Sequence, residues 1–571
     1  MENSIKNFLN KQHILLLLLI IIGSFFRLYN LNWGAPYYFH PDERNIASSV
    51  TQLHFPDQMN PHFFAYGSLS TYVTYFTGLI LNFFFTCHLP PITCLSAEAL
   101  AKVDHVTFEQ AIIISRFLSA FFSVGIIPLI YLVGRQLVDR KTGLLAASLA
   151  TFSTGLIQSA HFGTVEISTA FFSLFLFHMC TLLFKNSSLN KTLVASLIFG
   201  ILIATKITSL ILLPLPMLAM YIYAYSRKHI PWHQKLLMFI STASIFLLLA
   251  IFIYMITNPF TFISFAEFRN SMSYESGVAL GNLPVFYTGE FFGQAPVLFQ
   301  FTKIYPFLLN PLLAIIFIPA FFYVVYDGFK KRSSNYLLLI TYYLLLFIPN
   351  AFIFAKWTRY IVPTLPFIYL IIAITINSLY SSSEDRTERS RSARTIIAVL
   401  FIIPSIIFAI SYLITAFVQQ DSRIAAAKWA KINMLKDSKI ISEVYDLGIT
   451  PFNNSFNYNN IILFNFYDLD NNSPDATGKK LTNLIETSEY IILPSQRILK
   501  TRLQNPKQFP KGYSFYYKLL GGKLGYMKIY ETPCDIWCKI TYFNDPVNLS
   551  EITANVFERP TVLIFQKLNI K

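Results

Sequence analysis

The chain has 571 residues, of which 54% are hydrophobic and 13% are charged, whereas an average soluble domain carries about 25% charged residues. This composition excludes a simple soluble enzyme. The charges are also uneven, because residues 1–420 hold 42 of the 75 and residues 421–571 hold 33. The sequence therefore predicts a membrane-embedded module, residues 1–417, followed by a domain of soluble composition, residues 418–571.

Hydrophobic runs long enough to cross a bilayer recur through the first 420 residues and predict an α-helical multi-pass membrane protein with eleven transmembrane helices. The first run has no small-residue cleavage site and carries Arg27 at its far end, so we interpret it as a retained anchor and not as a signal peptide. The predicted spans are 13–30, 111–133, 143–160, 165–184, 192–205, 207–225, 236–257, 305–326, 336–354, 360–380 and 395–417.

Two long loops lie on the same side of the predicted membrane, at about 31–110 and about 258–304. The first contains an apolar stretch, residues 63–85, that is rich in Tyr, Thr and Phe. As a twelfth span, this stretch would invert every later loop and turn the basic loops outward. We therefore predict an interfacial or re-entrant helix that lies on the outer leaflet.

The distribution of Lys and Arg predicts the orientation. In residues 1–420, 17 of the 26 basic residues lie in loops on the N-terminal side, which nets +11 with its six acids. The positive-inside rule thus predicts a cytoplasmic N-terminus in a plasma or inner membrane. An odd number of spans then places residues 418–571 outside the cytoplasm. Because much of the net charge of +15 is a topology signal, we expect no nucleic-acid partner.

Four of the five cysteines form close pairs, Cys87/Cys94 and Cys534/Cys538. Both pairs fall outside the cytoplasm in this topology, where disulfides can form. Spacing alone does not decide between disulfides and free thiols. The fifth, Cys180, lies inside a predicted span and is interpreted as a packing residue.

The C-terminal part predicts a small α/β domain. Residues 421–435 have the pattern of an amphipathic helix that begins with an Asp cap. Residues 482–487 are interpreted as the end of a second helix. Short apolar runs predict strands at 439–444, 461–466, 490–493, 527–530 and 561–565.

Carboxylates near the outer ends of the spans are candidate functional groups, because ionisable side chains are costly beside lipid. Asp42 and Glu43 follow the first span, between His40 and Arg44, and Glu166 ends a short turn that also contains His161. Such carboxylates act as a general base or ligate a metal ion. The alternative is that they cap or begin a helix, which spacing alone leaves open.

Basic residues also occur on the outer side, where the positive-inside rule disfavours them. Lys206 interrupts apolar sequence, and Lys356, Arg359 and Tyr360 lie in the segment KWTRYIVP before the tenth span. One interpretation is that these side chains extend to the interface. The other is an anionic ligand, for which a phosphate group at the membrane surface is suitable.

These elements together resemble GT-C-fold glycosyltransferases of the protein-mannosyltransferase and aminoarabinose-transferase type, over essentially the whole chain. The resemblance is carried by Asp42-Glu43 after the first span, the HFGTVE turn, Lys206 within ATK, and KWTRYIVPTLP. Many relatives have Asp where this chain has Glu166, which weakens a metal-ligand assignment. The long β-trefoil insertion of eukaryotic protein mannosyltransferases is absent from the sequence, which favours a bacterial or archaeal origin.

The resemblance implies a GT-C-like catalytic module and transfer of a sugar, with inversion, from a polyprenyl-phosphate donor to a protein, lipid or glycan acceptor outside the cytoplasm. It implies Asp42 as the general base, with Glu43 and Glu166 positioning the acceptor or a divalent metal ion. The predicted substrate-binding residues are His40, Arg44, His161, Lys206, Lys356, Arg359 and Tyr360.

Three other functions are alternatives to this interpretation. A secondary transporter would place its polar groups near the bilayer midplane, whereas here they cluster at the outer ends of spans. A ligase or polymerase that moves an oligosaccharide from a lipid diphosphate would share most of these features. A non-catalytic scaffold would tolerate replacement of the outer acids.

Overall fold

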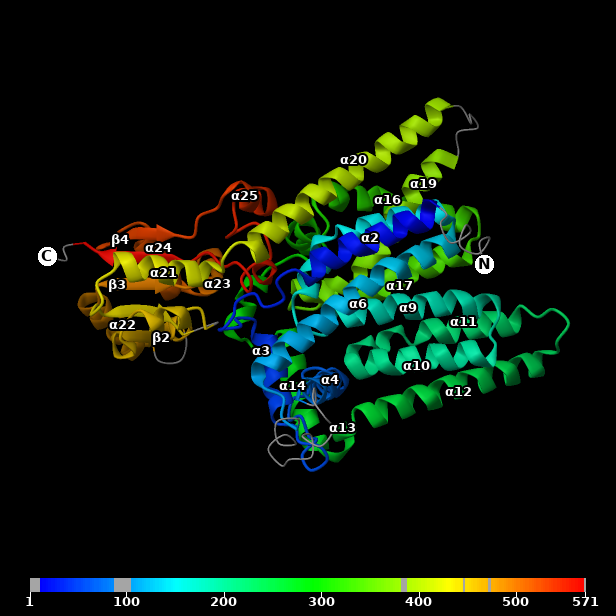
Figure 1. The fold of residues 1–571 in the computed structure, drawn as a ribbon, viewed down its shortest axis with the longest axis horizontal. Helices are drawn as coiled ribbons and strands as arrows, with labels where there is room; N and C mark the ends of the chain where they lie inside the picture. Colours follow the sequence, from blue (N-terminus) through cyan, green and yellow to red (C-terminus); the bar gives the residue numbers. More distant parts are fainter. Residues whose placement is uncertain (1–10, 87–103, 382–387, 445–446, 471–473, 569–571) are drawn as a thin grey trace.

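The computed structural model describes residues 11–86, 104–381, 388–444, 447–470 and 474–568. Figure 1 shows a bundle of long helices beside a smaller body that contains the β-sheet. The bundle is formed by the N-terminal part of the chain, and the sheet belongs to the C-terminal part, as the change in composition predicted.

The helices of the bundle fall on the predicted spans. Among the described residues, eight helical segments are long and apolar enough to cross a membrane, and two shorter apolar helices and one bent pair complete the match. The fold class is thus confirmed, and the number of eleven membrane crossings stays a prediction. The segments are α2 (Lys11–Leu28), α6 (Phe108–Leu137), α7 (Arg140–Thr151) with α8 (Thr154–Ala160), α9 (Glu166–Lys185), α10 (Leu189–Thr205), η2 (Ile207–Leu212) with α11 (Pro214–Tyr225), α12 (Trp232–Thr257), α16 (Pro311–Lys330) preceded by η4 (Gln300–Ile304) and α15 (Tyr305–Leu308), α17 (Ser334–Phe352), α18 (Thr358–Ile361) with η5 (Val362–Thr364) and α19 (Leu365–Ser381), and α20 (Glu388–Leu413) with η6 (Ile414–Val418).

The third predicted span is broken, and the break positions the site. Helices α7 and α8 meet at an angle of 57°. Ser153 begins α8 by accepting a hydrogen bond from the backbone N–H of Leu156 at 3.2 Å, which satisfies one of the free donors of the first turn. Helix α8 is buried throughout, and the short turn after it delivers Glu166 to the first position of α9.

Four further helices cover one end of the bundle: α3 (Pro41–Thr51), α4 (Ser68–Thr86), α13 (Phe260–Ile263) and α14 (Phe265–Leu280). Figure 1 shows α4 nearly end-on, across the direction of α10 and α12. A Cβ atom at Gly67 would lie 1.8 Å from the carbonyl oxygen of Ala204, so only glycine lets α4 begin this close to the end of α10. The predicted helix is therefore present, and its place at the membrane interface stays a prediction.

The C-terminal sheet has five strands in the order β2-β1-β3-β5-β4. Strand β1 pairs in parallel with β2 and β3, whereas β5 pairs antiparallel with β3 and β4. All five predicted strands are confirmed, as is the helix capped by Asp421. The elements are α21 (Ser422–Asn433), β1 (Ile440–Glu443), β2 (Ile461–Phe464), α22 (Pro474–Thr487), β3 (Tyr490–Leu493), α23 (Arg497–Gln504), α24 (Pro510–Leu520), β4 (Tyr526–Glu531), α25 (Ile536–Tyr542) and β5 (Leu563–Lys567), with short 3₁₀ turns η7 (Thr450–Asn454), η8 (Tyr458–Asn460), η9 (Phe466–Asp470) and η10 (Ile552–Ala554).

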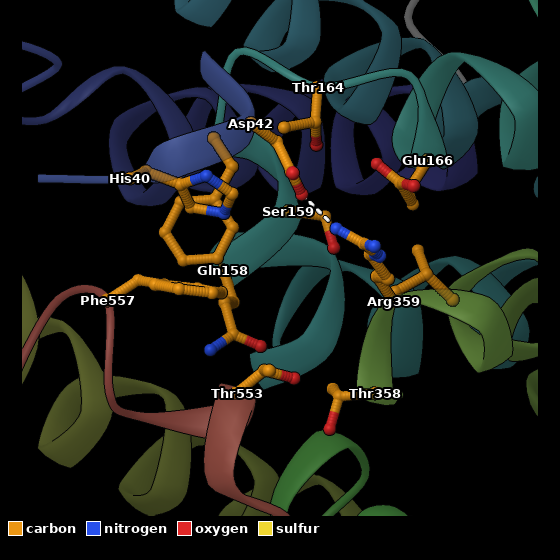
Figure 2. A pocket seen from close by; sticks show the side chains of 12 residues that line it. His40, Asp42, Gln158, Ser159, Thr164, Glu166, Thr358, Arg359, Thr553 and Phe557 are labelled. Carbon is orange, nitrogen blue, oxygen red and sulfur yellow. Dashed lines mark hydrogen bonds and ion pairs between the residues drawn. The ribbon is translucent and has the colours of Figure 1, made fainter. Parts of the chain in front are cut away.

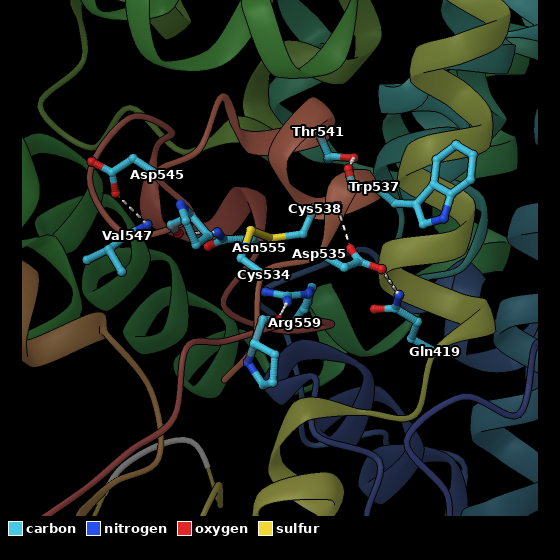
Figure 3. The surroundings of a disulfide bond; sticks show 12 residues. Gln419, Cys534, Asp535, Trp537, Cys538, Thr541, Asp545, Val547, Asn555 and Arg559 are labelled. Carbon is cyan, nitrogen blue, oxygen red and sulfur yellow. Dashed lines mark hydrogen bonds between the residues drawn. A yellow bond between two sulfur atoms is a disulfide. The ribbon is translucent and has the colours of Figure 1, made fainter. Parts of the chain in front are cut away.

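One predicted cysteine pair forms a disulfide. Cys534 and Cys538 are bonded, with their Cα atoms 5.2 Å apart (Figure 3). Between them, Asp535 caps α25 through the N–H of Cys538 and accepts a hydrogen bond from Gln419 at 2.6 Å. The hydrogen bond between Gln419 and Asp535 therefore joins α25 to the residues that follow the last predicted span. The Cys87/Cys94 pair lies outside the described residues, and Cys180 is a buried free thiol, as its packing role predicted.

Candidate active site

A pocket lies where the start of α3, the turn between α8 and α9, the start of α18 and a C-terminal segment meet (Figure 2). Helix ends converge there, so the lining combines charged groups from the bundle with neutral groups from the C-terminal domain. Four of the predicted site residues line it: His40, Asp42, Glu166 and Arg359. The complete lining also contains Gln158, Ser159, Phe162, Thr164, Thr358, Val362, Thr553 and Phe557.

Asp42 and Arg359 form an ion pair across this pocket (Figure 2). The two residues are 317 positions apart in the sequence. The guanidinium group of Arg359 also lies 4.8 Å from the ring centre of Trp357, which holds the side chain over the pocket. The two side chains remain 28% and 18% exposed for Arg359 and Asp42 respectively. The pair is therefore accessible to a ligand.

The surroundings of Asp42 keep it ionised. Burial by itself would raise the pKa of this carboxyl, but the charge of Arg359, with smaller contributions from His40 and the hydroxyl of Tyr66, outweighs burial and lowers the pKa below its usual value. Residue 42 is the second residue of α3, and the N-cap position is held by His40, whose side chain makes no capping bond. The carboxylate of Asp42 does not cap the helix and is paired with Arg359 instead.

Glu166 supplies a second carboxylate. One oxygen lies 3.3 Å from the ammonium group of Lys206, and the other, Oε2, has no hydrogen-bond partner among the described residues. The Glu166 side chain is 2% exposed. Lys206 follows the last residue of α10 and lies 5.1 Å from the ring centre of Tyr360. Glu166 therefore lines the pocket together with Arg359, and Lys206 is its ion-pair partner.

Three buried polar atoms around this pocket lack hydrogen-bond partners within the described parts of the chain: Nδ1 of His40, Oε2 of Glu166 and Nε of Arg359. The ring of His40 lies between Phe162 and Phe557, with centroids 4.5 and 4.3 Å away. Burial lowers the pKa of His40, which favours the neutral imidazole. Buried polar atoms are ordinarily paired, so these three atoms are candidate contacts for a ligand.

Glu43 occupies a different place from Asp42. Its carboxylate is fully buried and paired with Arg116 at 2.9 and 2.7 Å, and it also accepts a hydrogen bond from the N–H of Gly163 at 2.6 Å. Arg116 in turn donates to the carbonyl oxygens of Leu31 and Trp33. Breaking a buried pair of this kind typically costs about 3–5 kcal/mol. The geometry favours a structural role, in which Glu43 fixes the α8–α9 turn against the first outer loop.

Three other predicted residues lie apart from the pocket lining. Arg44 donates to the carbonyl oxygen of Tyr37 and covers the ring of Phe108. The ring nitrogens of His161 contact backbone carbonyl oxygens at 2.9 and 2.8 Å, and its ring stacks on Phe417. Lys356 donates to the carbonyl oxygens of residues 353 and 354 at the end of α17. All three side chains therefore contact backbone carbonyl groups.

Sequence reasoning missed most of the neutral wall of the pocket. Gln158 and Ser159 lie in the last turn of α8, and Thr164 lies in the turn that follows. All three belong to the short segment that ends at Glu166, so that segment was a signal for them. Thr553 and Phe557 reach the pocket from the C-terminal domain (Figure 2). No sequence motif indicates that these two residues belong to the site. The neutral wall as a whole therefore offers hydroxyl, amide and aromatic side chains to a polar ligand.

Two further side chains, Tyr66 and Glu275, come from the two long loops and interact electrostatically with the Asp42–Arg359 pair. The hydroxyl of Tyr66 contributes to the lowered pKa of Asp42, and Glu275 on α14 lies close enough for Arg359 and Asp42 to influence its pKa. Burial raises the pKa of Glu275, and Arg359 opposes this rise. Both outer loops thus contribute to the surroundings of the pocket.

The predicted metal ligands do not form a complete cation site. Among the described residues, no group of three or more His, Cys, Asp or Glu side chains is placed to hold a metal ion. The two carboxylates of the pocket, Asp42 and Glu166, are each paired with a basic side chain. Hard divalent cations take at least six oxygen ligands. A divalent metal ion stays a prediction, and no step below depends on one.

Comparison with known proteins supports the fold. Neither the family models nor the curated proteins gave a match. The apo crystal structure of the oligosaccharyltransferase from Archaeoglobus fulgidus matches 99% of this chain and 89% of its own length, with 12% identity and a TM-score of 0.52. The same organism's AglB with an inhibitory peptide and a dolichol-phosphate matches 98% of this chain and 88% of its own, with 13% identity and a TM-score of 0.49. ArnT from Cupriavidus metallidurans bound to undecaprenyl phosphate matches 97% of each chain, with 10% identity and a TM-score of 0.43.

The helices and the sheet define a multi-pass membrane protein with a C-terminal α/β domain. The match to the apo oligosaccharyltransferase, which covers nearly the whole chain, identifies the arrangement as the GT-C fold. The fold that the sequence resemblance implied is therefore confirmed.

Proposed function

We propose that the protein is a glycosyltransferase that moves a sugar from a polyprenyl-phosphate donor to an acceptor at the pocket. The observation that carries this proposal is the Asp42–Arg359 pair, in which a candidate general base and a candidate phosphate ligand share one accessible pocket. The GT-C fold supports it as well, because a structural neighbour with this fold is an oligosaccharyltransferase.

Arg359 is the proposed phosphate ligand, with Lys206 beside it. The unpartnered Nε of Arg359 is available to a phosphate oxygen, and a guanidinium group binds phosphate through paired hydrogen bonds. The lipid tail of the donor would extend along the apolar surface of the bundle. The neutral side chains of the pocket wall are left to contact the sugar.

Asp42 is the proposed base. Its carboxylate takes a proton from the acceptor as the acceptor oxygen or nitrogen attacks the anomeric carbon. The bond from that carbon to the phosphate oxygen breaks, and the polyprenyl phosphate leaves with its charge stabilised by Arg359. Attack opposite the leaving group inverts the anomeric configuration, and a second carboxylate on the sugar is not needed, unlike in a hydrolase.

The ion pair links donor binding to base activation. Before the donor binds, Arg359 is paired with Asp42, which lowers the pKa of Asp42 and so weakens it as a base. A phosphate group competes for the same guanidinium charge. Its arrival partly releases Asp42 and raises its basicity in the complex that needs it.

The arrangement favours this proposal over a transporter. Asp42 and Glu166 lie in the first turns of α3 and α9, Lys206 follows α10, and Arg359 begins a span. In the proposed topology these helix ends lie at the outer face of the membrane, whereas transporters bind their substrates near the bilayer midplane. The basic loops on the opposite side place this face outside the cytoplasm in the proposed topology.

The test is a transfer assay with purified full-length protein. Donors that carry the same labelled sugar on a polyprenyl monophosphate or on a polyprenyl diphosphate are compared, and the anomeric configuration of the product is determined by NMR. We expect turnover with the monophosphate donor and an inverted product. Turnover confined to the diphosphate donor would replace the proposal with a lipid-diphosphate-dependent ligase, and absence of turnover with a series of sugars would contradict it.

A further inference from the structure

The helix that carries Arg359 is capped by a residue from the C-terminal domain. Trp357 holds the N-cap position of α18 but makes no side-chain capping bond. Instead Oε2 of Glu551 accepts hydrogen bonds from the backbone N–H of Thr358 at 3.0 Å and from its hydroxyl at 2.6 Å. Free N–H groups of a first helical turn require such partners. Glu551 therefore satisfies the start of the helix from 193 residues away.

The same carboxylate also holds part of the pocket wall. Glu551 is fully buried, and it accepts hydrogen bonds from the N–H of Thr553 at 3.0 Å and from the hydroxyl of Thr553. Thr358 and Thr553 both line the pocket (Figure 2). One buried carboxylate thus joins the residue before Arg359 to the C-terminal wall.

The segment around Glu551 is itself anchored to the bundle side. Its N–H donates to the carbonyl oxygen of Lys303 at 2.9 Å, and the N–H of Ile552 donates to Glu290 at 2.8 Å. Glu290 forms an ion pair with Lys500 at 2.6 Å, with both side chains almost fully buried. These bonds hold the Glu551 backbone in place, so the position of its carboxylate is set before any ligand binds.

We propose that Glu551 is a positioning residue for Arg359, so that binding of the donor phosphate depends on the docked C-terminal domain. The inference rests on the proposed function, because it assumes that Arg359 binds the phosphate. Without the Glu551 carboxylate, the N–H and hydroxyl of Thr358 lose their acceptor in a buried setting, and the first turn of α18 must rearrange to regain one. A shift of about 1 Å in a substrate-positioning group is enough to weaken catalysis strongly.

The test is a double-mutant cycle with farnesyl phosphate as the probe, its affinity measured on purified full-length protein. We expect Glu551→Gln to raise the dissociation constant about fivefold or more, since an amide group places a donor against the donors of Thr358 and Thr553. Glu551→Asp, which keeps the charge, should recover part of the loss. The double variant Glu551→Gln/Arg359→Ala should bind no more weakly than Arg359→Ala alone, because Glu551 acts through Arg359.

Glu443→Gln is the matched control, because Glu443 is a buried glutamate of the same domain on strand β1. It should leave the affinity unchanged. Additive losses in the double variant, or unchanged affinity in both folded Glu551 variants, would overturn the positioning role. If Glu551→Gln does not fold, the cycle is run with Glu551→Asp and read in the same way. If Arg359→Ala itself binds farnesyl phosphate normally, the failure lies in the proposed function.

Discussion

Asp42→Asn is expected to lower the rate of glycosyl transfer about a hundredfold or more, while the protein stays folded. The variant should bind the donor at least as tightly, because the side chain that competes with the phosphate for Arg359 has lost its charge. General-base catalysis typically contributes about 10²–10⁴ in rate, and an amide cannot take the proton. The amide oxygen still accepts a hydrogen bond from Arg359, and the phosphate ligands are unchanged. Transfer and donor binding are measured side by side on the purified variant.

Asp139→Asn is the control for this experiment. Asp139 caps α7 through the N–H of Thr142 at 2.8 Å, and it lies on the opposite side of the predicted membrane. Asn caps a helix about as well as Asp, so this variant should transfer at the normal rate. Near-normal transfer by Asp42→Asn would remove Asp42 from the role of base and make Glu166 the next candidate.

Arg359→Ala is expected to weaken use of the donor about tenfold or more. A hydrogen bond to a charged group contributes about 1.5–3 kcal/mol, and 1.4 kcal/mol corresponds to about a factor of ten. Arg359→Lys should recover only part of the loss, because an ammonium group lacks the planar fork of two donors. The dissociation constant of the polyprenyl phosphate and the Michaelis constant of the donor are the measured quantities.

Arg359→Ala should also change the pH dependence of transfer. Arg359 is the main influence that lowers the pKa of Asp42 against the effect of burial. Without it the pKa rises, the base becomes protonated at higher pH, and the acid limb of kcat/KM for residual transfer moves to higher pH. Arg227→Ala is the control, since Arg227 stacks on Tyr223 away from the pocket lining. Unchanged donor kinetics, or an acid limb that stays in place, would contradict the assignment.

The sequence predicted the elements well because the membrane and the sheet each impose a simple pattern. Long apolar runs mark helices that must satisfy their own backbone in lipid, and the short apolar runs at 461–466 and 490–493 mark buried strands. The bend between α7 and α8 was missed, because Ser153 reads as an ordinary small residue inside an apolar run. Helices α23, α24 and α25 were missed as well, because at 8, 11 and 7 residues they are too short for a clear helical period in the sequence.

The candidate site was predictable only in part. Charged residues at the ends of apolar spans indicated Asp42, Glu166 and Arg359, and these three residues do line one pocket. Charge alone could not separate Asp42 from Glu43, because neighbours on a helix point in different directions and only the fold places Arg116 against Glu43. Thr553 and Glu551 act through contacts with distant segments, which a single sequence does not reveal.

The central claim is that the pocket around Asp42 and Arg359 binds a polyprenyl phosphate. Its most direct test is photo-crosslinking of the purified protein with a polyprenyl phosphate that carries a diazirine in its first isoprene unit, with the labelled peptides identified by mass spectrometry. The account predicts labelling of the segments 158–166 and 357–362, reduced in Arg359→Ala. Labelling confined to the opposite end of the bundle, or labelling of these segments that Arg359→Ala leaves unchanged, would contradict it.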